Sequence, residues 1–95
     1  MEQQRINLVF PKDLTKLAGN SFGTQTFIDQ VKNKIDYNKE CIIVFPNQID
    51  RIATSFIQGF FDDILQHIGL SGIKEQIFFE SSIEDLKKFV LENLD

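Results

Sequence analysis

Apolar residues return every three or four positions in three stretches of the chain, and this spacing predicts three helices. The first runs from Thr24 to about Asp36, the second from Phe56 to Ile68 and the third from Ser81 to Leu94. Gly69 follows the second stretch, where a left-handed residue commonly ends a helix. Ser81 and Glu84 have the spacing of a capping box at the start of the third.

Shorter apolar runs lie between these stretches and predict strands. Ile6 to Phe10 is closed by Pro11, which cannot donate a ladder hydrogen bond. Cys41 to Phe45 is continuously apolar, as in a central strand covered on both faces. Ile73 to Phe79 is the third predicted strand. Residues 12–20 fit either a short strand or a turn, and the pattern does not decide between them.

Strands and helices therefore alternate, which is the pattern of an α/β fold. Right-handed crossovers between successive strands favour parallel pairs. Ninety-five residues make one domain, and no linker rich in Pro, Gly and Ser divides them. We predict a small single α/β domain over residues 1–95, with a mixed or mostly parallel sheet and helices packed on it. Most of the ten phenylalanines are expected in its core.

Charge and cysteine content narrow the class of protein. A formal net charge of -4 argues against binding to nucleic-acid phosphates, and the basic residues form no stripe. Cys41 is the single cysteine, so no internal disulfide forms, and its apolar setting predicts a buried, inert thiol. The polar N-terminus resembles neither a signal peptide nor a membrane span. These features predict a cytoplasmic protein that does not insert into membranes.

The residues that catalysis needs are sparse in this chain. His67 is the only histidine, and we interpret it as a solvated helix residue. Asp62 and Asp63 are neighbours on a helix and point about 100° apart, so they cannot act as a pair. We expect no catalytic residues, no metal site and no cofactor, and hence no enzyme activity.

A glycine-containing turn before the first predicted helix offers two interpretations. In one, Ser21, Thr24 or Thr26 caps the helix that follows the segment Gly19 to Thr24. In the other, the turn holds a phosphate, although it lacks the Lys-Ser/Thr pair of a P-loop. The second interpretation supports an alternative function, a module that binds a small molecule or a nucleotide.

Two consecutive hydroxyl residues, Thr54 and Ser55, stand where the second helix is expected to begin. Either can cap the helix, and capping is the interpretation that physical chemistry alone favours. A phosphate is also tolerated at this position, because the helix dipole and free amides favour negative charge at a helix N-terminus.

The order of these pieces resembles the STAS-like family, small bacterial domains related to sulphate-transporter and anti-sigma-factor-antagonist domains. The resemblance covers about residues 17–95. It is carried by Gly19-x-Ser21-Phe22-Gly23-Thr24, by Cys41-Ile42-Ile43-Val44-Phe45, by Ile49-x-x-Ile52-Ala53-Thr54-Ser55-Phe56 and by the strand at Ile73 to Phe79. It implies a noncatalytic switch that binds a protein partner, often a kinase-like ATPase or anti-sigma-type regulator. Some members are phosphorylated at the helix start that here falls at Thr54, with Ser55 second.

We therefore expect a regulatory interaction domain. It would dock a protein partner through the rim around Gln48 to Phe56 and the exposed side of the second helix. Phosphorylation of Thr54 would add nearly two negative charges to that rim. The residues expected to line it for a partner or ligand are Ser21, Thr24, Gln48, Asp50, Arg51 and Phe56.

Overall fold

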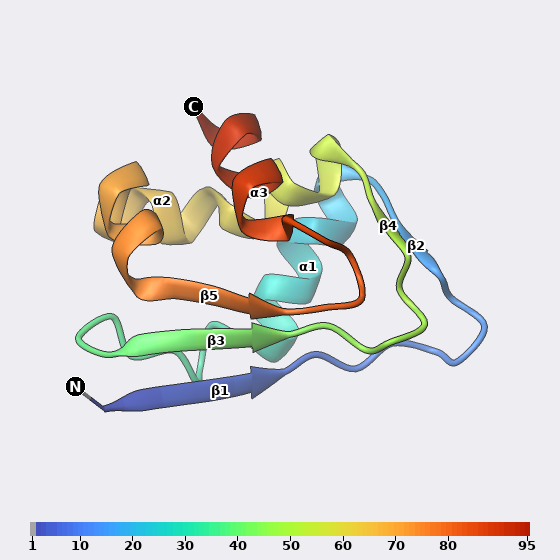
Figure 1. Ribbon diagram of the computed structural model, residues 1–95, viewed down its shortest axis with the longest axis horizontal. Coiled ribbons are helices and arrows are strands. Elements are labelled where there is room, and N and C mark those ends of the chain that lie inside the picture. Colours follow the sequence, from blue (N-terminus) through green and yellow to red (C-terminus); the bar gives the residue numbers. More distant parts are fainter. Residues whose placement is uncertain (1) are drawn as a thin grey trace.

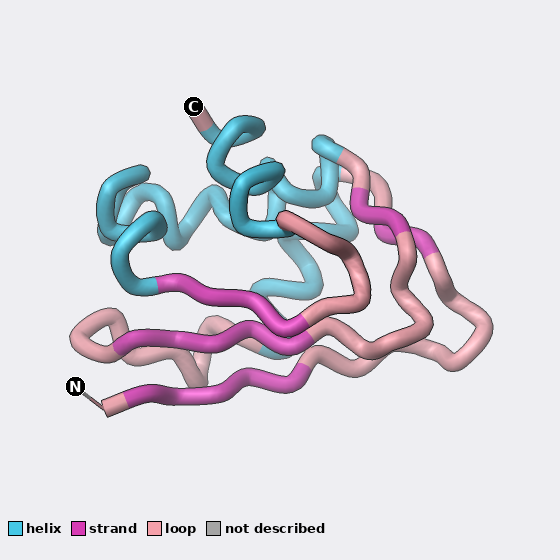
Figure 2. The backbone as a smooth tube through the Cα atoms, in the orientation of Figure 1, coloured by secondary structure: helices cyan, strands magenta, loops and turns pink. Residues whose placement is uncertain are grey.

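The computed structural model describes residues 2–95 and contains five strands, all in parallel pairs. Strands β1 (Gln3–Asn7), β3 (Glu40–Val44) and β5 (Ile77–Glu80) form one sheet in the order β1-β3-β5 (Figure 1). Two-residue strands β2 (Lys16–Leu17) and β4 (Arg51–Ile52) run side by side at one end of the molecule (Figure 2). The mostly parallel α/β prediction and the central place of β3 are confirmed.

Three helices complete the fold: α1 (Asn20–Gln30), α2 (Thr54–Gln76) and α3 (Leu86–Leu94). Helix α1 lies behind the sheet in Figure 1, and α2 and α3 lie beyond its β5 edge. Helix α2 is the centre of the helical layer, because both α1 and α3 pack on it. Within residues 2–95 no helix is both long and apolar enough to cross a membrane.

The two faces of the sheet differ in what covers them. Ile6, Cys41 and Ile43 point to the helices and are at most 2% exposed. On the opposite face, Ile42 is half-buried, and the prediction that both faces of this strand are covered is wrong. There the Arg5 guanidinium donates two hydrogen bonds to the Glu80 carboxylate, at 2.6 and 2.7 Å, so that β1 is bridged to β5 across β3.

Phenylalanine rings fill the layer between the sheet and the helices. Phe60 contacts Phe27 of α1, Phe56 of the same helix and Phe45 after β3. Six of the ten phenylalanines are less than 9% exposed, as predicted: Phe10, Phe27, Phe45, Phe56, Phe60 and Phe61. The aromatic core therefore ties α1, α2 and the sheet into one unit.

Helices α1 and α2 cross at two buried glycines. A Cβ atom on Gly23 would overlap the Phe56 carbonyl, and one on Gly59 would overlap the Asn20 carbonyl. The absence of a side chain therefore sets how closely the two backbones approach. Gly23 belongs to this contact and not to a turn, which is why the prediction of a loop here is wrong.

The first helix begins and ends earlier than the apolar spacing predicts. Gly19 takes the N-cap position with a φ of 102°, so the helix starts at Asn20 and not at Thr24. It ends at Gln30, whose side-chain amide both donates to and accepts from the backbone of Val9, at 2.9 and 2.7 Å. Residues 31–34 form turns, although Val31 and Ile35 still pack against the core.

The C-terminal third differs most from prediction. Gly69, at φ 69° and ψ 176°, interrupts α2, but the chain re-enters a helix through Gln76. Ile73 is therefore helical, and β5 begins only at Ile77. Ser81 does not build a capping box, because its hydroxyl accepts from the Ile83 amide at 3.0 Å; α3 starts at Leu86 after Asp85.

Candidate functional site

Thr54 is the first residue of α2 and is half-buried between that helix and α3. Ala53 occupies the N-cap position, so the prediction that a hydroxyl caps this helix is wrong. The Thr54 hydroxyl instead donates to Oδ1 of Asn93 at 2.9 Å. Asn93 in turn donates to the Phe89 carbonyl one turn earlier at 2.8 Å. Thr54 thus ties the start of α2 to the last turn of α3.

Ser55 lies next to Thr54 but has its partner on the opposite side. Its hydroxyl oxygen accepts from the Gly19 amide at 2.9 Å, at the N-cap of α1. This contact satisfies an amide that would otherwise be left without a helical partner. The two neighbouring hydroxyls are thus committed to different helices, Ser55 to α1 and Thr54 to α3.

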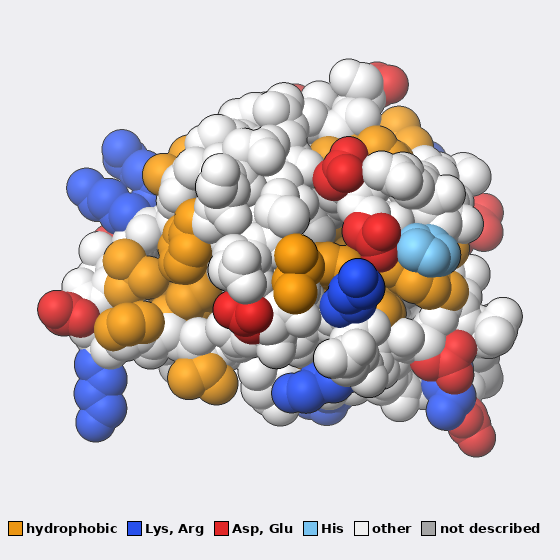
Figure 3. Space-filling model, turned by 180° about the vertical axis from the view of Figure 1, so that it is seen from behind, with side chains coloured by type: hydrophobic (Ala, Val, Ile, Leu, Met, Phe, Trp, Pro, Cys, Tyr) orange, Lys and Arg blue, Asp and Glu red, His pale blue; other side chains and the backbone are white. Residues whose placement is uncertain are grey.

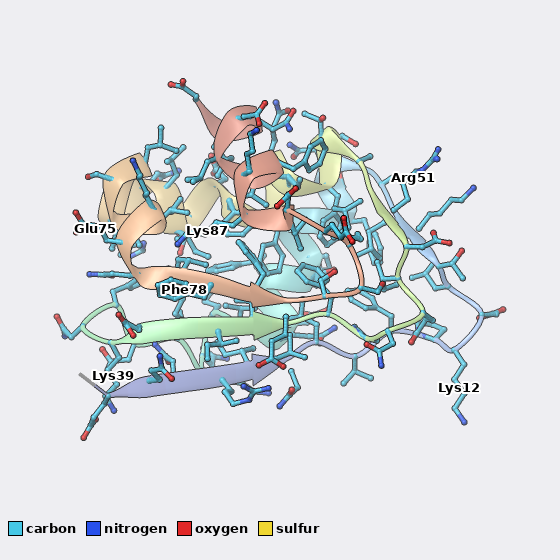
Figure 4. All side chains as sticks on the ribbon, viewed as in Figure 1. Lys12, Lys39, Arg51, Glu75, Phe78 and Lys87 are labelled. Atoms are coloured by element: carbon cyan, nitrogen blue, oxygen red, sulfur yellow. The ribbon has the colours of Figure 1, made fainter. Side chains whose placement is uncertain are left out.

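A groove of about 240 Å³ lies between β4 and the start of α3. One wall is Asp50, Arg51 and Ile52; the other is formed by Ile83, Glu84, Leu86 and Phe89. Phe89 is 38% exposed and is the largest apolar side chain of this lining. Arg51 extends outward from β4 at the end of the molecule (Figure 4). The groove thus combines charged groups of both signs with an apolar surface.

The other predicted rim residues are not gathered at this groove. Ser21 is exposed in the first turn of α1. Thr24 donates to the Gly59 carbonyl at 3.3 Å and lines a separate hollow between α1 and α2. Gln48 donates to the Pro11 carbonyl at 3.3 Å, and Phe56, at 1% exposed, belongs to the core. The prediction that Phe56 lines the rim is wrong, because its ring faces inward from α2.

The segment Gly19 to Thr24 does not form the turn that a phosphate would need. Residues 20–24 are helical, and the Gly19 amide is already donated to Ser55. None of the three hydroxyls predicted to cap the helix does so, since Gly19 is the N-cap; Thr26 is buried and donates to the Phe22 carbonyl at 2.8 Å.

The remaining reactive side chains have structural surroundings. Burial raises the pKa of the Cys41 thiol to about 11, in keeping with the predicted inert thiol. His67 is exposed, as predicted; it stacks on Tyr37 at 4.4 Å, and its Nδ1 lies 2.8 Å from the Asp63 carbonyl. Burial, followed by the nearby Asp63, raises the pKa of Tyr37 to about 12. Its hydroxyl is buried without a partner among residues 2–95.

Charge on the remaining surface is mixed. On the face seen from behind, acidic and basic side chains are intermixed (Figure 3). Residues 2–95 contain no group of three His, Cys, Asp or Glu side chains placed to hold a metal ion.

Two residues of the candidate site were missed by sequence reasoning. Asn93, 39 residues after Thr54, accepts from its hydroxyl, and Phe89, one turn earlier on α3, lines the groove. The apolar spacing of the last helix predicts a buried Phe89, and nothing local marks its exposure. Comparisons with protein families, with curated proteins and with solved structures gave no match for this chain.

Proposed function

We propose that this chain is a noncatalytic protein-interaction domain that docks a partner through the groove between β4 and α3. The observation that carries the proposal is the exposed Phe89 ring, flanked by Arg51 and Glu84 in a concave surface. An aromatic anchor surrounded by charged groups is the usual composition of a docking site. The STAS-like resemblance suggests a kinase-like ATPase as the partner.

Thr54 is the proposed point of control. A phosphate on its oxygen would remove the proton that now bonds Asn93 and would place nearly two negative charges against α3. The last turn of α3 would then have to move away from α2, and the groove wall that carries Phe89 would move with it. Ser55 is the weaker candidate, since its oxygen is held at the close crossing of α1 and α2.

Exposed apolar residues on two faces give a matched test of the docking site. Phe89 lies in the groove at 38% exposure, and Ile28 lies on α1 at 44% exposure. We expect Phe89→Ala to lose the protein that co-purifies with the wild-type chain from its native host, and Ile28→Ala to retain it. Loss with both variants, or with neither, would count against the β4–α3 groove.

The same preparation tests the control point by intact-mass measurement. We expect a fraction of the chain to carry one phosphate, at Thr54, and Thr54→Glu to bind the captured partner at least about tenfold more weakly or more tightly than wild type. A partner that binds Thr54→Glu and wild type equally would refute the switch while leaving the docking groove in place.

A further inference from the structure

A second groove, on the other side of α3, collects three lysines. It has a volume of about 650 Å³, lies between the end of α2 and the start of α3, and is lined by Lys74, Lys87, Lys88, Leu91 and Glu92. Among residues 2–95, none of these three ammonium groups lies within 4.0 Å of a carboxylate. The chain as a whole carries a net charge of -4, so this basic surface is opposite in sign to the protein around it.

Lys87 is the fixed member of the three. Its Nζ donates to the Lys74 carbonyl at 2.6 Å and lies 3.9 Å above the Phe78 ring, between α3 and β5 (Figure 4). Partial burial lowers the pKa of Lys87, and the charge of Lys74 lowers it further, whereas Glu40 raises it. Lys87 therefore forms part of the groove floor, while Lys74 and Lys88 are exposed beside it.

Contacts and dipoles within the fold account for two of these positions, but not for Lys88. Lys74 lies in the last turn of α2, where the helix dipole favours a cation. Lys87 lies in the first turn of α3, but its ammonium group bonds the Lys74 carbonyl at the end of α2 and lies over the Phe78 ring. Lys88 is exposed in the same turn, where the helix dipole favours an anion. A cation at Lys88 opposes the dipole of α3 and should therefore reduce the stability of the isolated protein.

We propose that this groove binds an acidic segment of a protein partner. Carboxylates of the segment would pair with Lys74 and Lys88 at the rim, and an apolar side chain would lie against Leu91. Such a ligand relieves the repulsion among the lysines and complements the dipole of α3. An anionic bilayer would also face Glu92 and the rest of a chain of net charge -4, whereas a peptide segment can place its carboxylates at the lysines alone.

The groove is distinct from the β4–α3 groove of the proposed function. Leu86 and Phe89 face that site, whereas Lys87, Lys88 and Leu91 face this one. The proposal does not depend on Thr54 or on the identity of the first partner.

A peptide titration of the full chain tests the proposal directly. The probe is a peptide of about twelve residues made of Glu and Leu, added to the isotope-labelled protein and followed by amide chemical shifts. The matched peptide has Gln in place of each Glu. We expect shifts centred on Lys74, Lys88 and Leu91 with the Glu peptide, weakening as salt is added, and at least about tenfold weaker binding of the Gln peptide.

Charge reversal at exposed lysines supplies the control. Lys74→Glu combined with Lys88→Glu should weaken binding by at least about tenfold. Lys12→Glu combined with Lys16→Glu should change it by less than about twofold, because Lys12 (Figure 4) and strand β2, which contains Lys16 (Figure 1), lie at the opposite end of the molecule. All four lysines are exposed, and circular dichroism would verify that each variant is folded.

Three outcomes would overturn the proposal. The first is the absence of shifts at about 1 mM Glu peptide. The second is equal weakening by the two double variants, which would indicate general charge attraction. The third is binding to phosphatidylserine vesicles without binding to the Glu peptide, which would assign the lysines to a membrane surface.

Discussion

Helix α2 packs against α1 on one side and α3 on the other, and the two interfaces are built differently. Against α1, buried glycines bring the backbones close enough that no side chain fits between them. Against α3, fewer residues meet, and a groove opens on each side of the shorter helix. The first interface fixes the relative positions of two helices, whereas the second leaves room for ligands and for movement.

The two hydroxyls at the start of α2 show the same division over a single peptide bond. Ser55 holds the N-cap of α1, and Thr54 holds the last turn of α3. A change at Ser55 should therefore act on folding, and a change at Thr54 should act on the position of α3. The predictions below test this division, beginning with the largest expected effect.

Gly59→Ala should be the most damaging single change to the α1 interface. The added methyl group would overlap the backbone of Asn20, so α1 and α2 would have to separate, and we expect a loss of about 3 kcal/mol or more in unfolding free energy. Ser71→Ala, an exposed position on the same helix, should change it by less than about 0.5 kcal/mol. Urea denaturation measures both. Equal, small losses would mean that the helices can separate at little cost.

Removing the Ser55 hydroxyl should cost more stability than removing the Thr54 hydroxyl, and the two losses should affect different parts of the chain. Ser55→Ala leaves the Gly19 amide without its acceptor, and we expect a loss of about 2 kcal/mol that is felt throughout the chain. Thr54→Val removes a hydrogen bond at a half-buried edge, and we expect a loss of about 1 kcal/mol. Hydrogen exchange should show faster exchange mainly in α3 for Thr54→Val. Faster exchange in α1 with Thr54→Val would contradict the assignment of Thr54 to the α3 interface alone.

The pattern of apolar residues predicted the longest helix, α2, and the central strand, β3. The wide stripe on α2 was identified because burial of those residues demands their spacing, whereas the apolar run of β3 identified the central strand although only Cys41 and Ile43 of it are buried. A glycine misled the same reasoning: Gly23 was interpreted as part of a turn, yet it lies in a helix. The sequence alone does not distinguish a glycine that allows close helix contact from a glycine that allows a turn.

The candidate site was predictable only in part. Asp50, Arg51 and Thr54 were identified because a polar loop leads into a helix. The opposite wall comes from α3 and the segment just before it, about 30 residues further along the chain, and no local pattern places it beside β4. Two-residue strands such as β2 and β4 are too short for their periodicity to be recognised, so the pairing that positions Arg51 could not be predicted.

High pH should lower the unfolding free energy through two groups whose pKa is raised by burial, Cys41 and Tyr37. Cys41 titrates at about 11 in the folded chain against an ordinary pKa of 9.0, so the folded state retains a proton that the unfolded state releases. Tyr37 shifts in the same direction, from 10.0 to about 12. The unfolding free energy should therefore fall as pH rises from about 9 to 12.

Urea denaturation at a series of pH values measures this slope. Tyr37→Phe should flatten the upper part of the decline, and at pH 7 it should leave stability unchanged or slightly higher, since the Tyr37 hydroxyl is buried without a partner among residues 2–95. A decline that is identical in Tyr37→Phe and in wild type would assign the effect to Cys41 or to other groups.

The smallest expected effect is at Lys88 in α3. A substitution there should change the stability of the protein and its affinity for the peptide in opposite directions. Lys88 stands in the first turn of α3, where the dipole favours an acid, so Lys88→Glu should raise the unfolding free energy by about 0.3 to 1 kcal/mol at low salt. The same variant should weaken binding of the acidic Glu-Leu peptide. If Lys88→Glu is more stable than wild type but binds the peptide more weakly, then lysine at this position lowers stability and serves binding. If instead Lys88→Glu destabilised the protein, the lysine would have a structural role in α3 that outweighs the helix dipole.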